Sequence, residues 1–188
     1  MIQHTITFLA GKSSDKSPMP IYLIFFLVPL MIFLGCSNEP GNPPEVNSIE
    51  KSGLDNIALY TMNNDPIDLQ QYKGKTVFIN FWATWCKPCI KEMPSIQKAK
   101  EILKDEEIVF LFATNDDTEA VASFKEENIF DFNYVQVKNL EDLNVQALPT
   151  TFIFAPDGEL EFSEAGFRKW DDKESLDLIL KIAHSNDK

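Results

Sequence analysis

Residues 82–94 read WATWCKPCIKEMP and place two cysteines, Cys86 and Cys89, three positions apart. The residues before them, 76–82, are rich in β-branched and aromatic side chains without clean alternation, which favours a central strand buried on both faces. The residues after them, 87 to about 104, repeat apolar side chains at helical spacing. The cysteine pair is therefore expected where a buried strand gives way to a helix.

A Cys-X-X-Cys pair at such a junction is chemically asymmetric. Cys86 is expected over the free N–H groups at the helix start, whose partial positive charge stabilises a thiolate, and Cys89 one turn deeper. We therefore predict that Cys86 attacks a disulfide and that Cys89 resolves the mixed disulfide, with no metal or organic cofactor. The charge of Lys87 favours the Cys86 thiolate and a carboxylate at Glu92 opposes it, and the sequence leaves their balance open.

Three other roles for the pair are less well supported. A structural zinc site needs two further Cys or His ligands, but His4 lies in the N-terminal region and only His184 follows the pair. A papain-like nucleophile needs a histidine base, for which His184 is again the only candidate in the folded part. A structural disulfide is a third alternative, although so short a loop gains little stability from closure.

The rest of the chain alternates strand and helix patterns, which indicates a parallel sheet joined by crossovers and places the protein in the α/β class. Residues 57–75 hold short apolar segments around the turn signal NNDP (63–66), consistent with a short N-terminal β extension. The further predicted elements are strands at 108–113 and 134–137, helices at 118–127 and 172–184, a helical turn at 140–143, and a hairpin of 150–155 with 159–165.

The N-terminus has the features of an export signal. The apolar run at 21–34 has the length of a signal-peptide core, whereas a membrane-spanning helix needs about 20 residues. Residues 33–36, FLGC, resemble a bacterial lipobox, which implies cleavage before Cys36 and a lipid on that cysteine. An uncleaved signal anchor is the alternative, and both place the domain outside the cytoplasmic membrane.

The expected organisation has three parts. Residues 1–35 form a lipoprotein signal peptide, residues 36–56 a lipidated cysteine with a Pro-rich tether, and residues 57–188 the folded domain. The 188 residues carry 17 Lys and Arg against 29 Asp and Glu, a net charge of −12, which argues against nucleic acid as a partner.

Two separate motifs resemble the thioredoxin superfamily. Residues 81–89, FWATWCKPC, with Glu92 and Pro94, resemble the active-site segment of its membrane-tethered TlpA-like and ResA-like thiol-disulfide oxidoreductases. Residues 148–151, LPTT, resemble the loop whose proline is cis in this superfamily. The resemblance implies a thioredoxin-like fold with a mixed sheet flanked by helices. It also implies that a cis Pro149 brings the Leu148 backbone to face Cys86, where it pairs with substrate.

The resemblance also assigns a proton-handling role. Glu92 matches the glutamate that ResA-like proteins place near their cysteines, and the alternative is an exposed glutamate paired with Lys91 or Lys98. Asn80 stands where thioredoxin has a buried aspartate, and an asparagine cannot take a proton. The residues expected to contact substrate are Trp85, Lys87, Pro88, Leu148 and Pro149.

The same resemblance implies a reductant, which the N-terminal signal would place in the cell envelope, and we expect it to be a monomer. A membrane electron donor of the DsbD/CcdA-like kind would supply it, and cysteine pairs of exported proteins would receive the electrons, with cytochrome c maturation as the role of the ResA-like branch. One alternative is a non-catalytic envelope module that binds through the thioredoxin surface. Another is a peroxiredoxin-type thiol peroxidase, which expects proline and threonine where this chain has Ile79 and Ala83.

Overall fold

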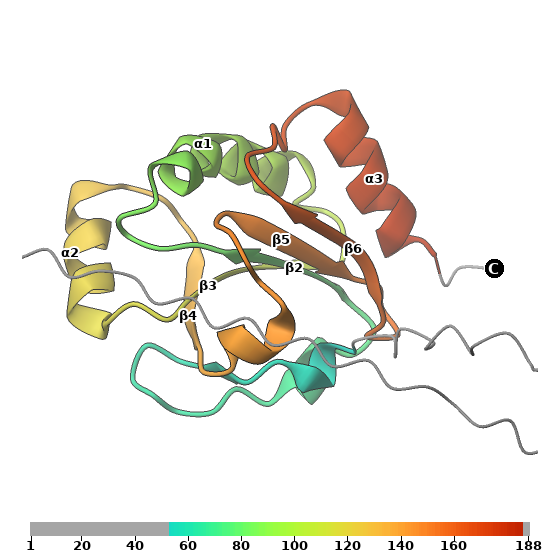
Figure 1. The fold of residues 1–188 in the computed structure, drawn as a ribbon. Helices are drawn as coiled ribbons and strands as arrows, with labels where there is room; N and C mark the ends of the chain where they lie inside the picture. Colours follow the sequence, from blue (N-terminus) through green and yellow to red (C-terminus); the bar gives the residue numbers. More distant parts are fainter. Residues whose placement is uncertain (1–52, 186–188) are drawn as a thin grey trace, which may run out of the picture. The chain divides into compact units, whose positions relative to one another are not determined.

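A six-stranded mixed sheet forms the centre of the computed structural model, which describes residues 53–185 (Figure 1). The strand order is β1-β4-β3-β2-β5-β6; β2, β3 and β4 are parallel, and β1, β5 and β6 each pair antiparallel to a neighbour. The strands are β1 (Leu59–Tyr60), β2 (Thr76–Phe81), β3 (Ile108–Thr114), β4 (Asn133–Val137), β5 (Thr150–Phe154) and β6 (Leu160–Ala165). The predicted mixed sheet and its C-terminal hairpin are confirmed.

Strand β2 is central because its sequence has no polar face. All six of its residues are buried, and it pairs with β3 on one side and β5 on the other. Successive side chains point to opposite faces, so Phe78 joins one core cluster while Val77 and Ile79 join the other. The strand that leads to the cysteine pair is therefore held on both edges and both faces.

Three helices cover one face of this sheet (Figure 1). They contribute apolar side chains to a single core cluster with Phe78, Phe110 and Phe112 of the sheet. The helices are α1 (Lys87–Ile102), α2 (Thr118–Glu127) and α3 (Lys173–Ala183). Among the described residues, no helix is long and apolar enough to cross a bilayer.

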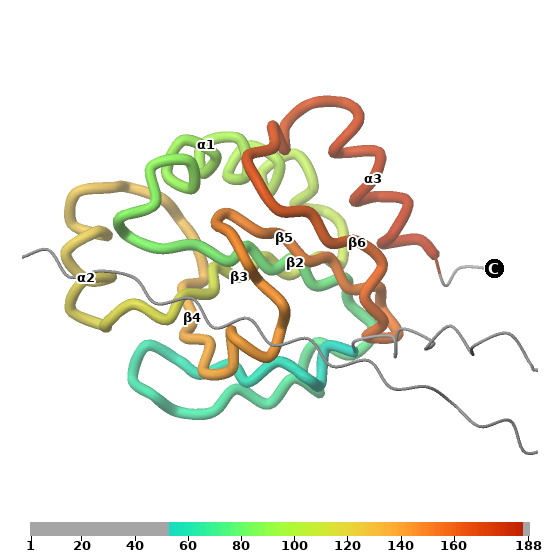
Figure 2. Tube along the Cα trace, viewed as in Figure 1, coloured from blue at the N-terminus to red at the C-terminus, as the bar shows by residue number. Residues whose placement is uncertain are grey.

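The N-terminal segment and the β4–β5 connection cover the opposite face, where they run side by side (Figure 2). Asn139 joins the two: its Oδ1 accepts the Ala58 N–H at 2.9 Å, and its Nδ2 donates to the Asn56 carbonyl at 2.8 Å. These segments contain three short 3-10 turns, η1 (Leu54–Asn56), η2 (Leu69–Tyr72) and η3 (Leu140–Leu143).

The folded unit begins before the boundary predicted at residue 57. Leu54 is buried, and its N–H donates to the Gly158 carbonyl at 2.8 Å, while Gly53 forms a β-bridge with Glu159. Residues 53–56 therefore belong to the domain. The predicted signal peptide (1–35), the lipidation site Cys36 and the tether up to residue 52 lie outside the described residues.

Candidate active site

The cysteine pair lies at the start of α1, as the sequence predicts. Cys86 is the N-cap residue, and Lys87 and Pro88 begin the first turn, where proline needs no hydrogen-bond partner. The two cysteines form a disulfide with their Cα atoms 5.3 Å apart. The Cys89 N–H points at the Cys86 Sγ, 3.3 Å away, so in the reduced protein the same backbone donor is available to a Cys86 thiolate.

The surroundings of the pair are buried on one side and open on the other. Cys86 and Cys89 are 4% and 1% exposed and belong to the helical core cluster. Trp85, by contrast, is 72% exposed, and Lys87 and Pro88 are exposed as well. The three predicted substrate-contacting residues around the cysteines are thus accessible to solvent.

An aspartate far from the motif holds the loop between β2 and α1. Asp116, which follows β3, accepts the Thr84 N–H through Oδ2 at 2.6 Å. Its own carbonyl accepts the Gln136 side-chain amide at 2.7 Å. This role was not predicted, because only the pairing of β2 with β3 and β3 with β4 brings these segments together.

The Leu148–Pro149 peptide bond is cis, as the resemblance implies. Phe81 at the end of β2 pairs with Thr150 at the start of β5. Pro149 therefore lies at the same end of the sheet as the loop that carries the cysteines. The Pro149 carbonyl accepts the Gly166 N–H at 2.7 Å, and Leu148 is half-buried against both core clusters. The register brings the two motifs to one end of the sheet although they are far apart in sequence.

Glu92 is buried inside α1, one turn after Cys89. Its Oε1 accepts a hydrogen bond from the Trp170 indole N–H, and its Oε2 accepts no side-chain hydrogen bond from the described residues. Burial raises the Glu92 pKa to about 7; the Trp170 bond and the Arg168 amide lower it, and the charge of Glu164 raises it. A buried carboxyl with a pKa near neutral therefore lies on α1, one helical turn after Cys89.

The alternative partners proposed for Glu92 are engaged elsewhere. Lys91 lies over the ring of Phe167, 5.2 Å from its centroid, and Lys98 forms a 3.0 Å ion pair with Asp171. The exposed-glutamate alternative is therefore wrong, because the Glu92 side of α1 faces the core.

Asn80 is buried in β2 and makes a neutral contact. Its Nδ2 donates to the Thr151 Oγ1 at 3.0 Å across the β2–β5 pair. The amide therefore joins the two strands and, unlike a carboxyl, has no proton to exchange.

His184 is remote from the pair. It contacts Glu106 at 2.9 Å, beyond the C-terminal end of α1, whereas Cys86 caps the N-terminal end of this helix of about 24 Å. It cannot act as the base of a papain-like site. Within residues 53–185, no group of three or more His, Cys, Asp or Glu side chains is arranged to hold a metal ion.

Comparisons with known proteins agree with this geometry. The sequence matches the AhpC/TSA family over residues 54–163. It is 34% identical over 143 residues to the thioredoxin-like protein YneN of Bacillus subtilis, covering 71% of this chain and 82% of that protein. It is 33% identical over 130 residues to the thiol-disulfide oxidoreductase ResA of Bacillus thuringiensis, covering 67% and 73%.

A solved structure shows the same fold. The crystal structure of a Chlorobium tepidum protein, described as a DsbE-type thiol:disulfide interchange protein, aligns with a TM-score of 0.63 at 21% identity, covering 72% of this chain and 99% of that one. The relatives and the cysteine geometry agree with each other. The chain belongs to the AhpC/TSA family, as a thioredoxin-like thiol-disulfide oxidoreductase related to ResA.

Proposed function

We propose that this protein is a membrane-tethered reductant that passes electrons from Cys86 and Cys89 to cysteine pairs of exported proteins. One observation carries the proposal: Cys86 caps α1 at the sheet end that also holds the cis-proline, with a buried carboxyl one helical turn beyond Cys89. A pair that served only to staple the helix start would need neither the cis-proline nor a costly buried acid.

The exchange proceeds in two displacement steps. The Cys86 thiolate attacks one sulfur of the substrate disulfide, forms a mixed disulfide and releases the other substrate sulfur as a thiolate. Cys89 then loses its proton and attacks the Cys86 sulfur, which releases the second substrate thiolate and closes the Cys86–Cys89 disulfide. The substrate gains two electrons, and protons from Cys89 and solvent convert its sulfurs to thiols. A dithiol of a DsbD/CcdA-like membrane donor reduces the pair again.

Glu92 handles the proton of the second step. Its pKa of about 7 lets the ionised carboxylate accept the Cys89 proton near neutral pH and return it to solvent or to the leaving thiolate. The neutral Asn80 amide has no such capacity.

Substrate binds across the exposed side of the pair. Trp85, Lys87 and Pro88 provide apolar area and positive charge, and the backbone of Leu148, one residue before the cis-proline, pairs with an extended substrate segment. Main-chain hydrogen bonds do not depend on the side chains of the substrate. This mode of recognition therefore fits substrates that have a cysteine pair in common but no longer sequence motif.

The signal peptide, Cys36 and tether anchor this monomeric domain to the membrane in the cell envelope. The apolar run at 21–34 and the FLGC motif support the anchor. Cytochrome c maturation is the role that the resemblance of residues 81–89 to the ResA-like branch favours. A peroxidase is less well supported. A peroxiredoxin carries proline and threonine at two positions before its cysteine, and this chain has the buried apolar residues Ile79 and Ala83 there.

Trapping in the source cell tests this proposal. Cys89→Ser leaves the mixed disulfide on Cys86 unresolved, so we expect covalent complexes with exported, cysteine-containing proteins that separate on reduction. A Cys86→Ser/Cys89→Ser double variant is the control and traps nothing. Absence of adducts with the single variant, or adducts with cytosolic proteins alone, would overturn the proposed substrate class, and an unchanged phenotype of Cys86→Ser would favour the binding module.

A further inference from the structure

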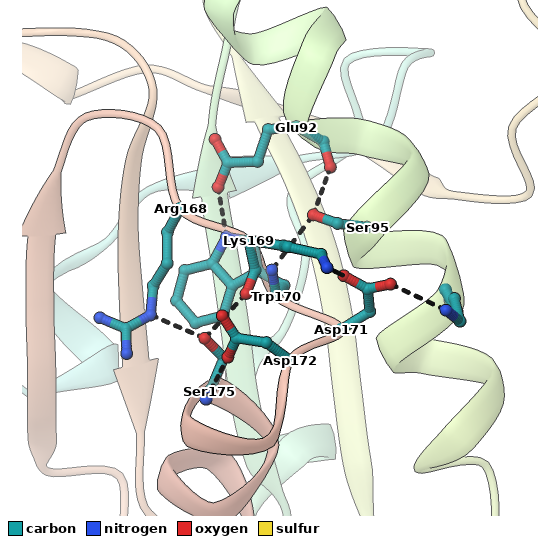
Figure 3. Close-up of polar contacts among 9 residues, drawn as sticks. Glu92, Ser95, Arg168, Lys169, Trp170, Asp171, Asp172 and Ser175 are labelled. Carbon is teal, nitrogen blue, oxygen red and sulfur yellow. Dashed lines mark hydrogen bonds and ion pairs between the residues drawn. The ribbon is translucent and has the colours of Figure 1, made fainter.

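Glu92 and Trp170 are joined both through their side chains and through their backbones (Figure 3). The indole N–H donates to Glu92 Oε1. The Trp170 backbone N–H donates to the Ser95 hydroxyl at 3.2 Å, and that hydroxyl donates to the Glu92 carbonyl at 2.8 Å. The Ser95 hydroxyl thus closes a ring of contacts that fixes the indole relative to the turn of α1 that carries the carboxyl.

The segment that carries Trp170 is itself anchored. Trp170 is 1% exposed and packs edge-on against Phe78, with ring centroids 4.7 Å apart. The Arg168 guanidinium lies over the indole, 5.4 Å from the ring centroid (Figure 3). Asp171, the residue after Trp170, forms an ion pair with Lys98 on α1. The indole donor is therefore held in place before any proton moves.

This arrangement makes the two carboxyl oxygens unequal. An indole N–H is only a donor, so the oxygen that it contacts, Oε1, acts as an acceptor in both protonation states of Glu92. Oε2 is buried and accepts no side-chain hydrogen bond from the described residues. The proton of neutral Glu92 therefore belongs on Oε2. The other groups that act on the carboxyl are Glu164 of β6, whose charge favours the neutral form, and the Arg168 amide, which favours the ionised form.

We infer that Trp170 is a positioning residue for the exchange reaction: it holds Glu92 Oε1 so that Oε2 alone takes up and releases the proton. This inference rests on the proton-handling role proposed for Glu92. It requires that removal of the indole donor, with the ring kept, changes the titration of the carboxyl.

The oxidised full-length protein provides a clean test, because its disulfide-bonded cysteines do not titrate. Side-chain carboxyl ¹³C NMR follows the Glu92 midpoint, which Glu92→Gln assigns by its disappearance. Trp170→Phe keeps an aromatic ring but removes the donor that lowers the pKa, so we expect the midpoint to rise by about 0.5 to 1 pH unit. Ser95→Ala should raise it by less.

A matched control is available on α2, where the Ser123 hydroxyl also donates to a helix carbonyl, that of Glu119 at 3.0 Å. Ser123→Ala should leave the midpoint unchanged. In the reduced protein, the pH profile of mixed-disulfide resolution should shift with Trp170→Phe in the same direction, and the shift should vanish in a Glu92→Gln background.

An unchanged midpoint in both Trp170→Phe and Ser95→Ala overturns the inference, as does a kinetic shift that persists in the Glu92→Gln background. If Trp170→Phe fails to fold, the Glu92 midpoint in Ser95→Ala tests the inference alone: a raised midpoint supports it and an unchanged midpoint overturns it. The titration uses oxidised protein and needs no activity, so it can contradict the role of Trp170 while exchange persists. A wild-type protein that fails to exchange would instead contradict the proposed function.

Discussion

Glu92 is a buried acid whose ionised form is costly. Its pKa is raised from the ordinary value of 4.5 to about 7, chiefly by burial. Between these two values the native state holds the proton and the unfolded chain has released it, so stability falls as the pH rises through this window. The protein is therefore expected to be most stable, as far as this group is concerned, at and below the lower value.

Glu92→Gln removes this penalty and keeps an oxygen that can accept the Trp170 bond. Above about pH 8, the oxidised variant should be more stable than the wild type by roughly 3 kcal/mol, and near pH 4.5 the two should be nearly equal. Urea unfolding at both pH values measures the difference. Glu101→Gln, an exposed change on the same helix, is the control. Parallel pH dependence of Glu92→Gln and wild type would contradict the burial argument.

The cysteine loop depends on an element that is remote in sequence. Asp116, after β3, accepts the Thr84 N–H at 2.6 Å. We expect Asp116→Ala to lower the free energy of unfolding by about 1–3 kcal/mol, because a partly buried backbone donor loses a charged acceptor. Urea unfolding of the oxidised protein measures this loss.

The neighbouring aspartate is the control for that experiment. Asp117 is the N-cap of α2 but makes no side-chain capping bond. Asp117→Ala should therefore cost clearly less than Asp116→Ala. If both variants lost the same free energy of unfolding, the bond between Asp116 and the Thr84 N–H would contribute nothing beyond the general effect of removing an acid near the start of α2.

The N-terminal segment contributes to stability because it covers the second face of the sheet. Leu59 in β1 is 2% exposed and packs in the core cluster on this face, with Val77 and Ile79 of β2. Leu59→Ala should destabilise the protein by about 2–5 kcal/mol. Ile102→Ala on α1, where the side chain is 51% exposed, should change stability by about 0.5 kcal/mol or less. Similar denaturant midpoints for the two variants would contradict this packing role.

For the molecule as a whole, the sequence predicts what depends on local patterns. The strand-to-helix junction follows from periodicity, and the resemblance of FWATWCKPC and LPTT to the thioredoxin superfamily implies the cis-proline and the mixed sheet. The start of the fold was missed because Leu54 stands at the edge of a polar, proline-rich stretch, and only its contact with Gly158 shows that it is buried.

The supporting residues of the site could not be predicted, for a related reason. Trp170 stands alone between charged residues, RKWDD at 168–172, and lies 78 positions from Glu92, so no spacing pattern joins them. Asp116 likewise reaches Thr84 only through strand pairing. Residues that react belong to recognisable motifs, whereas residues that hold them are brought together by the fold.

The central claim is that Cys86 and Cys89 exchange electrons with protein disulfides, and insulin reduction by the full-length protein tests it most directly. With dithiothreitol as electron source, the wild type should accelerate insulin reduction well above the rate of dithiothreitol alone, and Cys86→Ser should not, because no thiolate remains to attack. A folded, fully reduced wild type that is no faster than Cys86→Ser would contradict the account.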